Sequence, residues 1–204
     1  MAAVSPTVNS PDRGAPDGTY TRRPMTTRPS LRELVALGEL DPNLAALVWL
    51  LAEHGLPLTV ASSDRGAAER MRGAIVAAAG TGRAARLAPA GGVVLADSLE
   101  GVLRALGGDA ALNDATRELG LVVIHDGRRV RSAHYVRTVE RDGAGHLQRR
   151  PPAVLGDWNE RSGHFDDFWW AVTDELATRI AMSRAALEDE LDRRRVQLAE
   201  VGRA

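Results

Sequence analysis

Residues 58–80 read LTVASSDRGAAERMRGAIVAAAG, and this stretch decides the fold that we expect. Leu58-Thr59-Val60-Ala61 is a short apolar run that is typical of a buried strand. A short polar loop, Ser62–Gly66, follows, and the alanine-rich segment after it predicts a helix to about Ala79. A helix that directly follows a strand presents its first amides where nucleotide-binding domains hold phosphate. The stretch therefore predicts an α/β domain with a candidate anion site at this junction.

Two short helices are predicted before this strand. Ser30 and Glu33 have the spacing of a capping box, in which each side chain accepts a hydrogen bond from the other residue's backbone amide. Asp41-Pro42 opens the second helix, with aspartate as its cap and proline at the first helical position. Apolar residues then recur at helical spacing until Gly55.

Two further buried strands are predicted later in the chain, at Val93-Val94-Leu95-Ala96 and at Leu121–His125. A helix capped by Asp97 or Ser98 follows the first of them. Another short helix is expected from about Ala110 to Leu119. Strands that alternate with helices in this way are typical of an α/β fold.

The remaining chain is predicted to form a hairpin and then helices. Asp126-Gly127 is a strong signal for a two-residue hairpin turn, which leads into an extended segment at Arg128–Glu140. Ala153–Trp158 is also expected to be extended. The C-terminus is expected to be helical in two pieces that divide near Ser183.

Composition divides the chain into three parts. Residues 1–29 are rich in proline, threonine and serine and have almost no apolar content, which predicts a disordered leader. Residues 30–165 are expected to form the α/β domain, with a mixed sheet and an antiparallel hairpin at one edge. Residues 166–204 are expected to form C-terminal helices that pack on this domain or extend from it. No apolar run is long enough to span a bilayer.

The ionisable residues exclude several chemistries. The chain has 204 residues; its 26 Lys plus Arg are all arginine, and it has no cysteine. A phosphate-loop lysine, a Schiff-base lysine, thiol catalysis and cysteine-ligated metals are therefore excluded. The absence of cysteine fits a cytoplasmic location. The net charge of −1 gives no overall field that would attract phosphate.

Three segments resemble the ATPase family that drives type II/IV secretion and pilus assembly, and most of all its Flp-pilus (tight-adherence) branch. The first is PSLRELVALG at residues 29–38, together with the helix at Leu44–Leu51 and the strand at Leu58–Ala61. The second is ADSLE at residues 96–100, which resembles the family's histidine-box strand and the helix after it. The third is the strand Leu121–Ile124. The resemblance implies a P-loop (RecA-like) fold and hydrolysis of ATP with Mg²⁺.

The phosphate-binding loop of that family reads G-x-x-x-x-G-K-[ST], and this chain departs from it at the functional positions. Ser62 and Ala67 stand where the two glycines belong. Ala68 replaces the lysine that neutralises phosphate, and Glu69 replaces the hydroxyl residue that binds Mg²⁺. We therefore expect no bound cofactor at this loop. The degenerate loop positions are Ser62, Ser63, Asp64, Arg65, Gly66, Ala67, Ala68 and Glu69.

Two other active-site elements of the family are also missing. Only about a dozen residues separate Ala79 from Val93, which is near the minimum for a single crossover connection and leaves no room for the family's acidic metal-binding strand. Leu95 stands where the histidine box carries its histidine. The resemblance therefore implies a degenerate and centrally shortened member of the family.

These departures favour a pseudo-ATPase with no catalytic residues, which acts as a scaffold or regulatory partner. Its partner would be an active paralogous secretion or pilus ATPase, or another component of the assembly. One alternative is a residual ATPase that binds ATP and Mg²⁺ only within an oligomer. In that alternative Arg65 or Arg70 would take the place of the missing lysine.

A second alternative is a binding module for nucleic acid or an acidic partner. Residues 128–150 contain seven arginines and two acidic residues, a net charge of 7 − 2 = +5. Arg129, Arg131, Tyr135 and Arg137 share strand parity, so they are predicted to form one basic face with one aromatic ring. A solvated strand face is the simpler interpretation, and nucleic acid is therefore not the partner that we expect.

Other polar and aromatic groups have structural interpretations. Asp97 and Glu100 are expected to cap a helix rather than to act as paired carboxylates. The five histidines are scattered, so we expect no metal site. Arg193–Arg195 predict a solvated helix face. An aromatic cluster is expected to pin the C-terminal helices onto the sheet, or else to be a contact hot spot: Trp158, Phe165, Phe168, Trp169 and Trp170.

Overall fold

The computed structural model describes residues 29–80, 92–108, 119–137, 140–141, 143–148 and 150–199. Within these ranges the chain has an α/β fold built on a six-stranded mixed sheet, which confirms the predicted class. The leader expected over residues 1–29 lies outside the described residues except for Pro29. The helix expected over residues 110–119 lies outside them except for Leu119. Among the described helices, none combines the length and apolar character that a membrane crossing requires.

The two helices expected before the first strand are present. α1 (Leu31–Ala36) begins after Ser30, whose hydroxyl accepts a hydrogen bond from the Glu33 amide, while the Glu33 carboxylate accepts one from the Ser30 amide. α2 (Pro42–Glu53) begins after Asp41, whose Oδ1 accepts hydrogen bonds from two first-turn amides. Both predicted caps are therefore confirmed.

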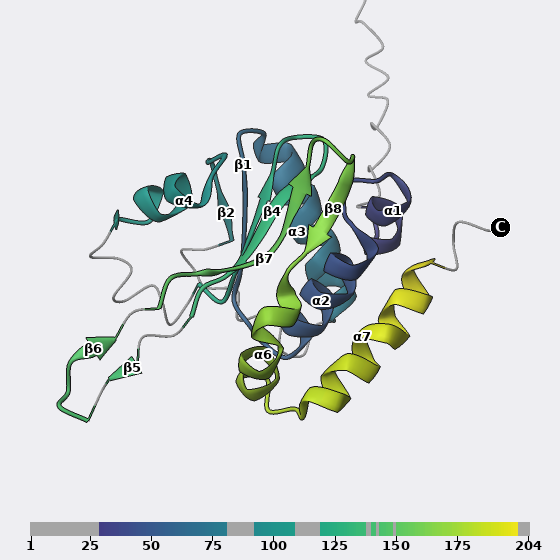
Figure 1. Ribbon diagram of the computed structural model, residues 1–204. Helices are drawn as coiled ribbons and strands as arrows, with labels where there is room; N and C mark the ends of the chain where they lie inside the picture. The colour runs from purple at the N-terminus through teal and green to yellow at the C-terminus, as the bar shows by residue number, and fades with distance from the viewer. Residues whose placement is uncertain are drawn as a thin grey trace, which may run out of the picture.

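A six-stranded sheet runs through the centre of the molecule (Figure 1). Its strand order is β2-β1-β3-β4-β7-β8, in which β2, β1 and β3 are parallel and the remaining pairs are antiparallel. The strands are β1 (Leu58–Ser62), β2 (Val93–Val94), β3 (Leu121–His125), β4 (Val130–Tyr135), β7 (Ala153–Asn159) and β8 (His164–Asp167).

Helices cover the two faces of the sheet unequally. α3 (Arg65–Ala79) follows β1 and packs with α1 and α2 on one face, where the main core lies. α4 (Leu99–Ala105) follows β2 and packs on the opposite face, where Val102 and Val122 belong to a smaller core. Figure 1 shows α4 beside β2, far from β7 and β8. The α4 side of β4, β7 and β8 has no helix from the described part of the chain packed on it.

The antiparallel half of the sheet differs from the predicted hairpin. The turn between β3 and β4 is Asp126–Arg129, because the amide of its first residue donates to the carbonyl of its last; the two-residue turn is wrong. β4 ends at Tyr135, and a separate ribbon, β5 (Glu140–Arg141) with β6 (Leu147–Gln148), follows it. Strand β8 at the sheet edge was not predicted, and the domain boundary expected after residue 165 lies inside it.

The C-terminal segment is helical in two pieces, as predicted. A short 3₁₀ helix, η2 (Trp169–Val172), leads into α6 (Thr173–Arg179), and α7 (Arg184–Ala199) starts just after Ser183. The Ser183 hydroxyl accepts a hydrogen bond from the amide of Ala186, which fixes the start of α7.

Helix α7 lies along α2 and is fastened there by an arginine (Figure 1). Arg194 is only 6% exposed, and its guanidinium carbon lies 4.4 Å from the ring centroid of Trp49. The same guanidinium lies 2.7 Å from Glu53 and 2.8 Å from Glu190. The solvated face predicted for Arg193–Arg195 is therefore wrong at Arg194, because the flat guanidinium finds an aromatic surface and two carboxylates.

Candidate functional site

The predicted phosphate-loop positions lie at the junction of β1 and α3. β1 ends at Ser62 and α3 begins at Arg65, so only Ser63 and Asp64 separate the strand from the helix. Positions Arg65 to Glu69 are helical and do not form a loop. The main chain therefore has no segment at this junction that can wrap around a phosphate as the glycine-rich motif does. The expected loop over Ser62–Gly66 is shorter than predicted, because Asp64 already caps the helix.

The carboxylate of Asp64 occupies the helix terminus. Its Oδ1 accepts hydrogen bonds from the amides of Gly66 at 2.8 Å and Ala67 at 3.2 Å. The Asp64 amide in turn donates to the hydroxyl of Ser62 at 3.1 Å. An incoming phosphate needs unpaired amides and the positive end of the helix dipole. Here the negative side chain of Asp64 already pairs with these amides and with the positive end of the helix dipole, so a second anion would be repelled.

The other degenerate positions are either exposed on α3 or buried in the core. Arg65 Nε lies 3.0 Å from Glu69 Oε1, one helical turn away, and both side chains are largely exposed. Arg70, the second arginine considered as a lysine replacement, is also exposed, and its guanidinium reaches back along α3 to the backbone of Gly66 at the start of the helix. Ala67 and Ala68, at a glycine position and the lysine position of the motif, are buried in the core beneath α3.

This junction lies at the edge where open α/β sheets usually bind ligands. β1 lies between β2 and β3 in the sheet. The chain runs from β1 through α3 to β2 on one side of β1, and then through α4 to β3 on the other side. The carboxyl ends of β1 and β3 meet where these connections diverge, which is the usual ligand crevice of such folds. Ser62 and His125 are register partners at this point.

His125 is a fully buried polar group at this edge. Its Nδ1 accepts a hydrogen bond from the Gly127 amide at 2.9 Å, and its Nε2 lies 3.6 Å from Glu39 Oε2. Burial lowers the pKa of His125, an effect that Glu39 and Asp126 partly oppose. The imidazole is therefore neutral near pH 7, with its proton on Nε2 facing Glu39. It lies between the α1–α2 loop and the turn after β3, and its buried Nε2 forms no hydrogen bond within the described part of the chain.

The remaining candidate acidic and metal-binding groups are part of ordinary local structure. The Ser98 hydroxyl accepts a hydrogen bond from the Gly101 amide at 3.2 Å, so Ser98 rather than Asp97 caps α4. Glu100 pairs with Arg104 one turn further along the helix. Within the described ranges, no three His, Asp or Glu side chains are grouped so that they could hold a metal ion.

The predicted basic face does not form, and a bulge near the start of β4 is the physical reason. The register between β3 and β4 shifts there, so Arg131 breaks the simple alternation of side chains on which the prediction rested. Arg129 precedes β4 and stacks on Trp158, with its guanidinium carbon 4.1 Å from the ring centroid. Arg131 pairs with Glu160 and lies 3.8 Å from Asp126.

Tyr135 and Arg137 lie at the opposite end of β4. Tyr135 faces the main core and is 4% exposed. Arg137 donates from Nε and Nη2 to the Glu175 carboxylate at 2.8 and 3.3 Å, and from Nη1 to the Pro151 carbonyl at 2.6 Å. The prediction of one face that contains all four residues is therefore wrong.

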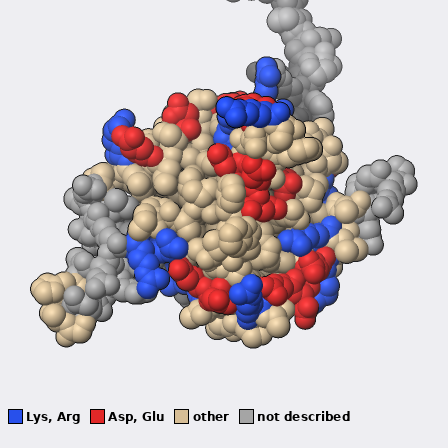
Figure 2. All heavy atoms as spheres, in the orientation of Figure 1, with Lys and Arg blue, Asp and Glu red and all other residues tan. Residues whose placement is uncertain are grey.

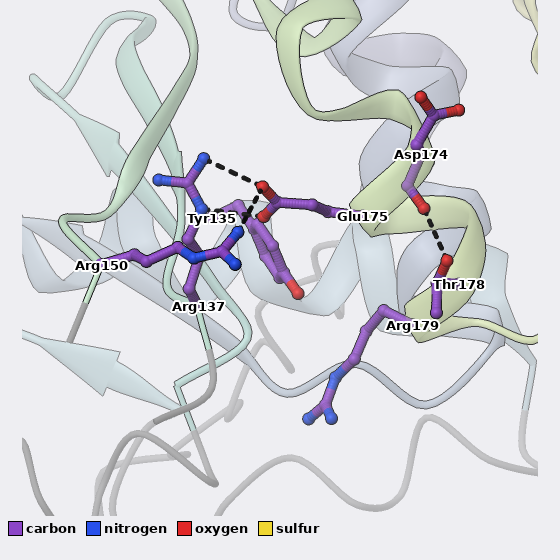
Figure 3. Close-up of a pocket in the computed structure, with 7 residues that line it drawn as sticks. All are labelled: Tyr135, Arg137, Arg150, Asp174, Glu175, Thr178 and Arg179. Atoms are coloured by element: carbon purple, nitrogen blue, oxygen red, sulfur yellow. Dashed lines mark hydrogen bonds and ion pairs between the residues drawn. The ribbon is translucent and has the colours of Figure 1, made fainter. Parts of the chain in front are cut away.

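A cavity of about 500 Å³ opens beside the Arg137–Glu175 pair (Figure 3). It lies between the ends of β4 and β7 and helix α6. Arg150, from the segment before β7, lies 3.4 Å from the same Glu175 carboxylate. Figure 3 shows the Arg179 side chain extending from α6 away from the group formed by Arg137, Arg150 and Glu175.

Sequence reasoning found only part of this cavity. Arg137 and Tyr135 were singled out, but Arg150, Glu175 and Arg179 were not. Glu175 and Arg179 are four residues apart, a spacing that predicts nothing more than a pair along a helix. No local pattern signals that α6 meets the ends of two strands.

The predicted aromatic cluster divides into a packed group and an exposed group. Trp158 and Phe165 are cross-strand partners, and Phe165 and Trp169 pack against the main core. Phe168 and Trp170 remain exposed, Trp170 by 65%. The structural interpretation therefore holds for the first group, and the second group is available for contact with another molecule.

Comparison with known proteins adds no functional assignment. No protein-family model matches the chain, and no curated protein matches it. The residues at the β1–α3 junction and around the cavity therefore carry the functional argument.

Proposed function

We propose that the chain is a non-catalytic, shortened relative of the type II/IV secretion and pilus-assembly ATPases, with a P-loop (RecA-like) origin for its α/β domain. It acts by contact, as a scaffold or regulatory partner, and not by hydrolysing ATP. The observation that carries this proposal is the Asp64 carboxylate on the amides of Gly66 and Ala67. These are the groups that would otherwise receive a phosphate.

The sheet supplies a surface for such contact on the α4 side of β4, β7 and β8, which we call the open face. Asp157 and Asp166 are directly opposite each other on β7 and β8, and Asp157 is also the register partner of Ser132 on β4. Figure 2 shows acidic side chains gathered over β7 and β8. Like charges directly opposite each other on neighbouring strands lower the stability of a sheet. They also make this face complementary to a basic partner surface.

We place the protein in the cytoplasm, with an active paralogous secretion or pilus ATPase as its partner. In this proposal it has no cofactor of its own, nucleic acid is not its partner, and it joins the partner's oligomer. Its contribution would be to change how the active subunits assemble or turn over, which requires surface complementarity and no catalytic group.

The contact is tested by measuring ATP hydrolysis by a purified active type II/IV secretion ATPase from the same genome, with and without the chain. We expect the rate to change at least about twofold, with saturation as the chain is added. Replacing Asp157 and Asp166 together by lysine should abolish the effect, because the open face then repels a basic partner. The control Glu100→Lys, on α4, should leave the effect intact. An unchanged hydrolysis rate at saturating concentrations would contradict the proposed role.

The residual-ATPase alternative is tested by melting temperature with Mg-ATP and Mg-ADP. A ligand at 100 times its Kd adds about 2.7 kcal/mol to the unfolding free energy, which is a clear rise in melting temperature. The proposal predicts no rise that depends on Arg65. A rise that Arg65→Ala abolishes would restore the residual ATPase, because Arg65 would then have left Glu69 to bind the phosphate.

The nucleic-acid alternative has its own test. Binding to duplex DNA that weakens steeply with salt, and that is lost when Arg129 and Arg131 are both changed to alanine, would favour it over the pseudo-ATPase. We expect no such binding, because Arg129 is stacked on Trp158 and Arg131 is paired with Glu160.

A further inference from the structure

We infer that the open face binds an amphipathic helix of a partner protein, one that carries an apolar stripe flanked by lysine or arginine. This partner chemistry rests on the proposed contact function, because both use the same open face. Three features of the face carry it: exposed apolar side chains, acidic side chains without a matching cation, and a layer of helices that stops short of β4.

The register of the strands places particular side chains on the open face. Ser132 and His134 on β4 face this side, where the imidazole Nε2 lies 3.0 Å from the serine hydroxyl, while the residues that alternate with them belong to the main core. Their register partners on β7 are Asp157 and Val154, and Asp157 is also the partner of Asp166 on β8. Register partners share a face, so a valine and two aspartates lie together here.

Two apolar side chains are exposed on this face. Val154 is 43% exposed and Phe168 is 38% exposed. Asp167, which precedes Phe168, faces the opposite side of the sheet and accepts a hydrogen bond from Asn43 of α2 at 2.6 Å. Alternation along the strand therefore turns Phe168 toward the open face. The Phe168 amide donates to the Leu155 carbonyl at 2.8 Å, which keeps this ring beside β7.

Trp170 extends the apolar surface beyond the end of β8. Its side chain is 65% exposed, and its indole Nε1 donates to the Asp167 carbonyl at 3.1 Å, so the ring is held in place at the surface. Figure 2 shows uncharged side chains over η2, directly next to the acidic side chains of β7 and β8. An exposed tryptophan that is already held in place is typical of the anchor residues of protein interfaces.

The two aspartates keep negative charge that no cation on this face neutralises. In the described part of the chain, Asp157 forms no side-chain hydrogen bond or ion pair, and Asp166 accepts one hydrogen bond, from Asn159 at 2.9 Å. Arg131 acts on Asp157 only at longer range, because its ion pair is with a glutamate just after β7. Burial lowers the pKa of His134, so this imidazole is uncharged near pH 7. A partner with basic residues would therefore complement this face.

A helix is the element that this face lacks. On the same side of the sheet, α4 covers the parallel strands, where Val102 and Val122 share the smaller core. No helix from the described ranges continues this layer over β4, β7 and β8. A helix with apolar residues three and four positions apart would bury the exposed valine and aromatic rings, and basic residues along its edge would pair with the two aspartates.

The test uses a fluorescein-labelled peptide of about 18 residues with leucine and lysine at helical spacing, which is long enough to form a helix. Fluorescence anisotropy with the full chain at low salt should give saturable binding with a Kd below about 100 µM. Two control peptides should bind at least about tenfold more weakly. One has glutamate in place of lysine, and the other has the same composition with the leucines spread around the helix.

Variants of the chain locate the bound peptide. Trp170→Ala should raise the Kd at least about tenfold, because it removes the aromatic anchor. The matched control is Leu95→Ala, at a position that is 61% exposed directly after β2, at the other edge of the sheet; it should leave the Kd unchanged. Asp157→Asn combined with Asp166→Asn should raise the Kd several-fold and make it less dependent on salt. Circular dichroism checks that each variant is folded, and the comparison of peptides needs no variant.

Absence of saturable binding, equal binding of the three peptides, or a folded Trp170→Ala variant that binds like the parent protein would each overturn the inference. Dimers of the chain that Trp170→Ala dissociates, measured by sedimentation, would assign the open face to a second copy and would also overturn it. Peptide binding without any change in the ATPase rate would support the helix-binding face and contradict the proposed function. A changed ATPase rate without peptide binding would support the proposed function and overturn the helix-binding face.

Discussion

The parallel and antiparallel halves of the sheet differ in how their charged side chains are paired. At the carboxyl end of β1, in the parallel half, Asp64 satisfies the amides of Gly66 and Ala67 and Arg65 is paired with Glu69. Beside the ends of β4 and β7, in the antiparallel half, Arg137 and Arg150 share the Glu175 carboxylate, and a third arginine, Arg179, lines the same cavity. The edge at which the fold would place a ligand is therefore occupied by the protein's own acidic side chain, whereas the cavity beside α6 brings arginines together around one carboxylate.

The two halves also differ in how they are covered. β1 and β3 have helices packed on both faces, whereas β7 has the main core on one side and the open face on the other. Truncating a side chain in the parallel half should therefore lower the unfolding free energy more than truncating a matched side chain on the open face.

The largest expected effect compares two valines on the same side of the sheet. Val122, on β3, is fully buried under the α4 side, and Val154, on β7, is 43% exposed. Val122→Ala should lower the unfolding free energy by about 2 kcal/mol, because it removes buried methyl groups and leaves a cavity. Val154→Ala should change it by less than about 0.5 kcal/mol. Urea unfolding of both variants measures this, and equal losses would mean that the open face is covered.

The next effect concerns the junction that closes the parallel half. Asp64→Ala removes the acceptor for the Gly66 and Ala67 amides and should cost about 1 kcal/mol of unfolding free energy. Asp64→Asn keeps a side-chain oxygen at the cap and should cost less than about 0.5 kcal/mol. Thermal unfolding of the two variants separates the hydrogen bonds from the charge. If the alanine variant has the same melting temperature as the parent protein, the Asp64 cap does not stabilise the junction.

Much of the parallel half follows from local sequence, because its signals lie within a few residues of one another. The Ser30–Glu33 capping box, the Asp41 cap and the strand Leu121–His125 are all where short patterns predict them. The length of the β1–α3 loop was wrong, since a sequence match to a motif does not reveal that Asp64 starts the helix early.

The antiparallel half depends on contacts between distant segments, and sequence reasoning failed there. β8 is a short strand whose polar residues give little alternation, and only pairing with β7 shows it to be a strand. The sequence around Arg194 predicts a solvated helix face. Only the fold places this arginine against Trp49, which is far away in the sequence. The cavity was missed for the same reason, because Glu175 meets Arg137 and Arg150 only after α6 packs against the strand ends.

A smaller effect on stability is expected from pH, through the buried histidines in the two halves of the sheet. Burial lowers the pKa of His125, in the parallel half, and of His134, in the antiparallel half, below the ordinary 6.5. The unfolded chain therefore binds protons more readily than the folded chain below pH 6.5, so stability is full above pH 7 and falls as the pH drops through this window.

The midpoint of urea unfolding at pH 7 and pH 5.5 measures this dependence. His125→Asn should reduce the loss between the two pH values more than His134→Asn does, because His125 is fully buried. His164→Asn, at an exposed position on β8, should retain the parent slope. A His125→Asn variant with an unchanged slope would show that this imidazole is not held neutral by burial.

The smallest effect is expected at the exposed arginine of the antiparallel half. Arg131→Ala removes pairs with Glu160 and Asp126 that are partly open to water, and it should lower the unfolding free energy by no more than about 0.5 kcal/mol. Chemical unfolding at low and at high salt measures this. A loss above about 1 kcal/mol would mean that the bulge in β4 depends on this arginine.

The most direct measurement of the central claim is an amide NMR titration of the protein with Mg-ATP, which follows the signals of Gly66 and Ala67. These two signals should stay in place at millimolar nucleotide, because the Asp64 carboxylate already accepts hydrogen bonds from the two amides. Saturable shifts at Gly66 and Ala67 would contradict the proposed pseudo-ATPase, since they would mean that the junction still receives a phosphate.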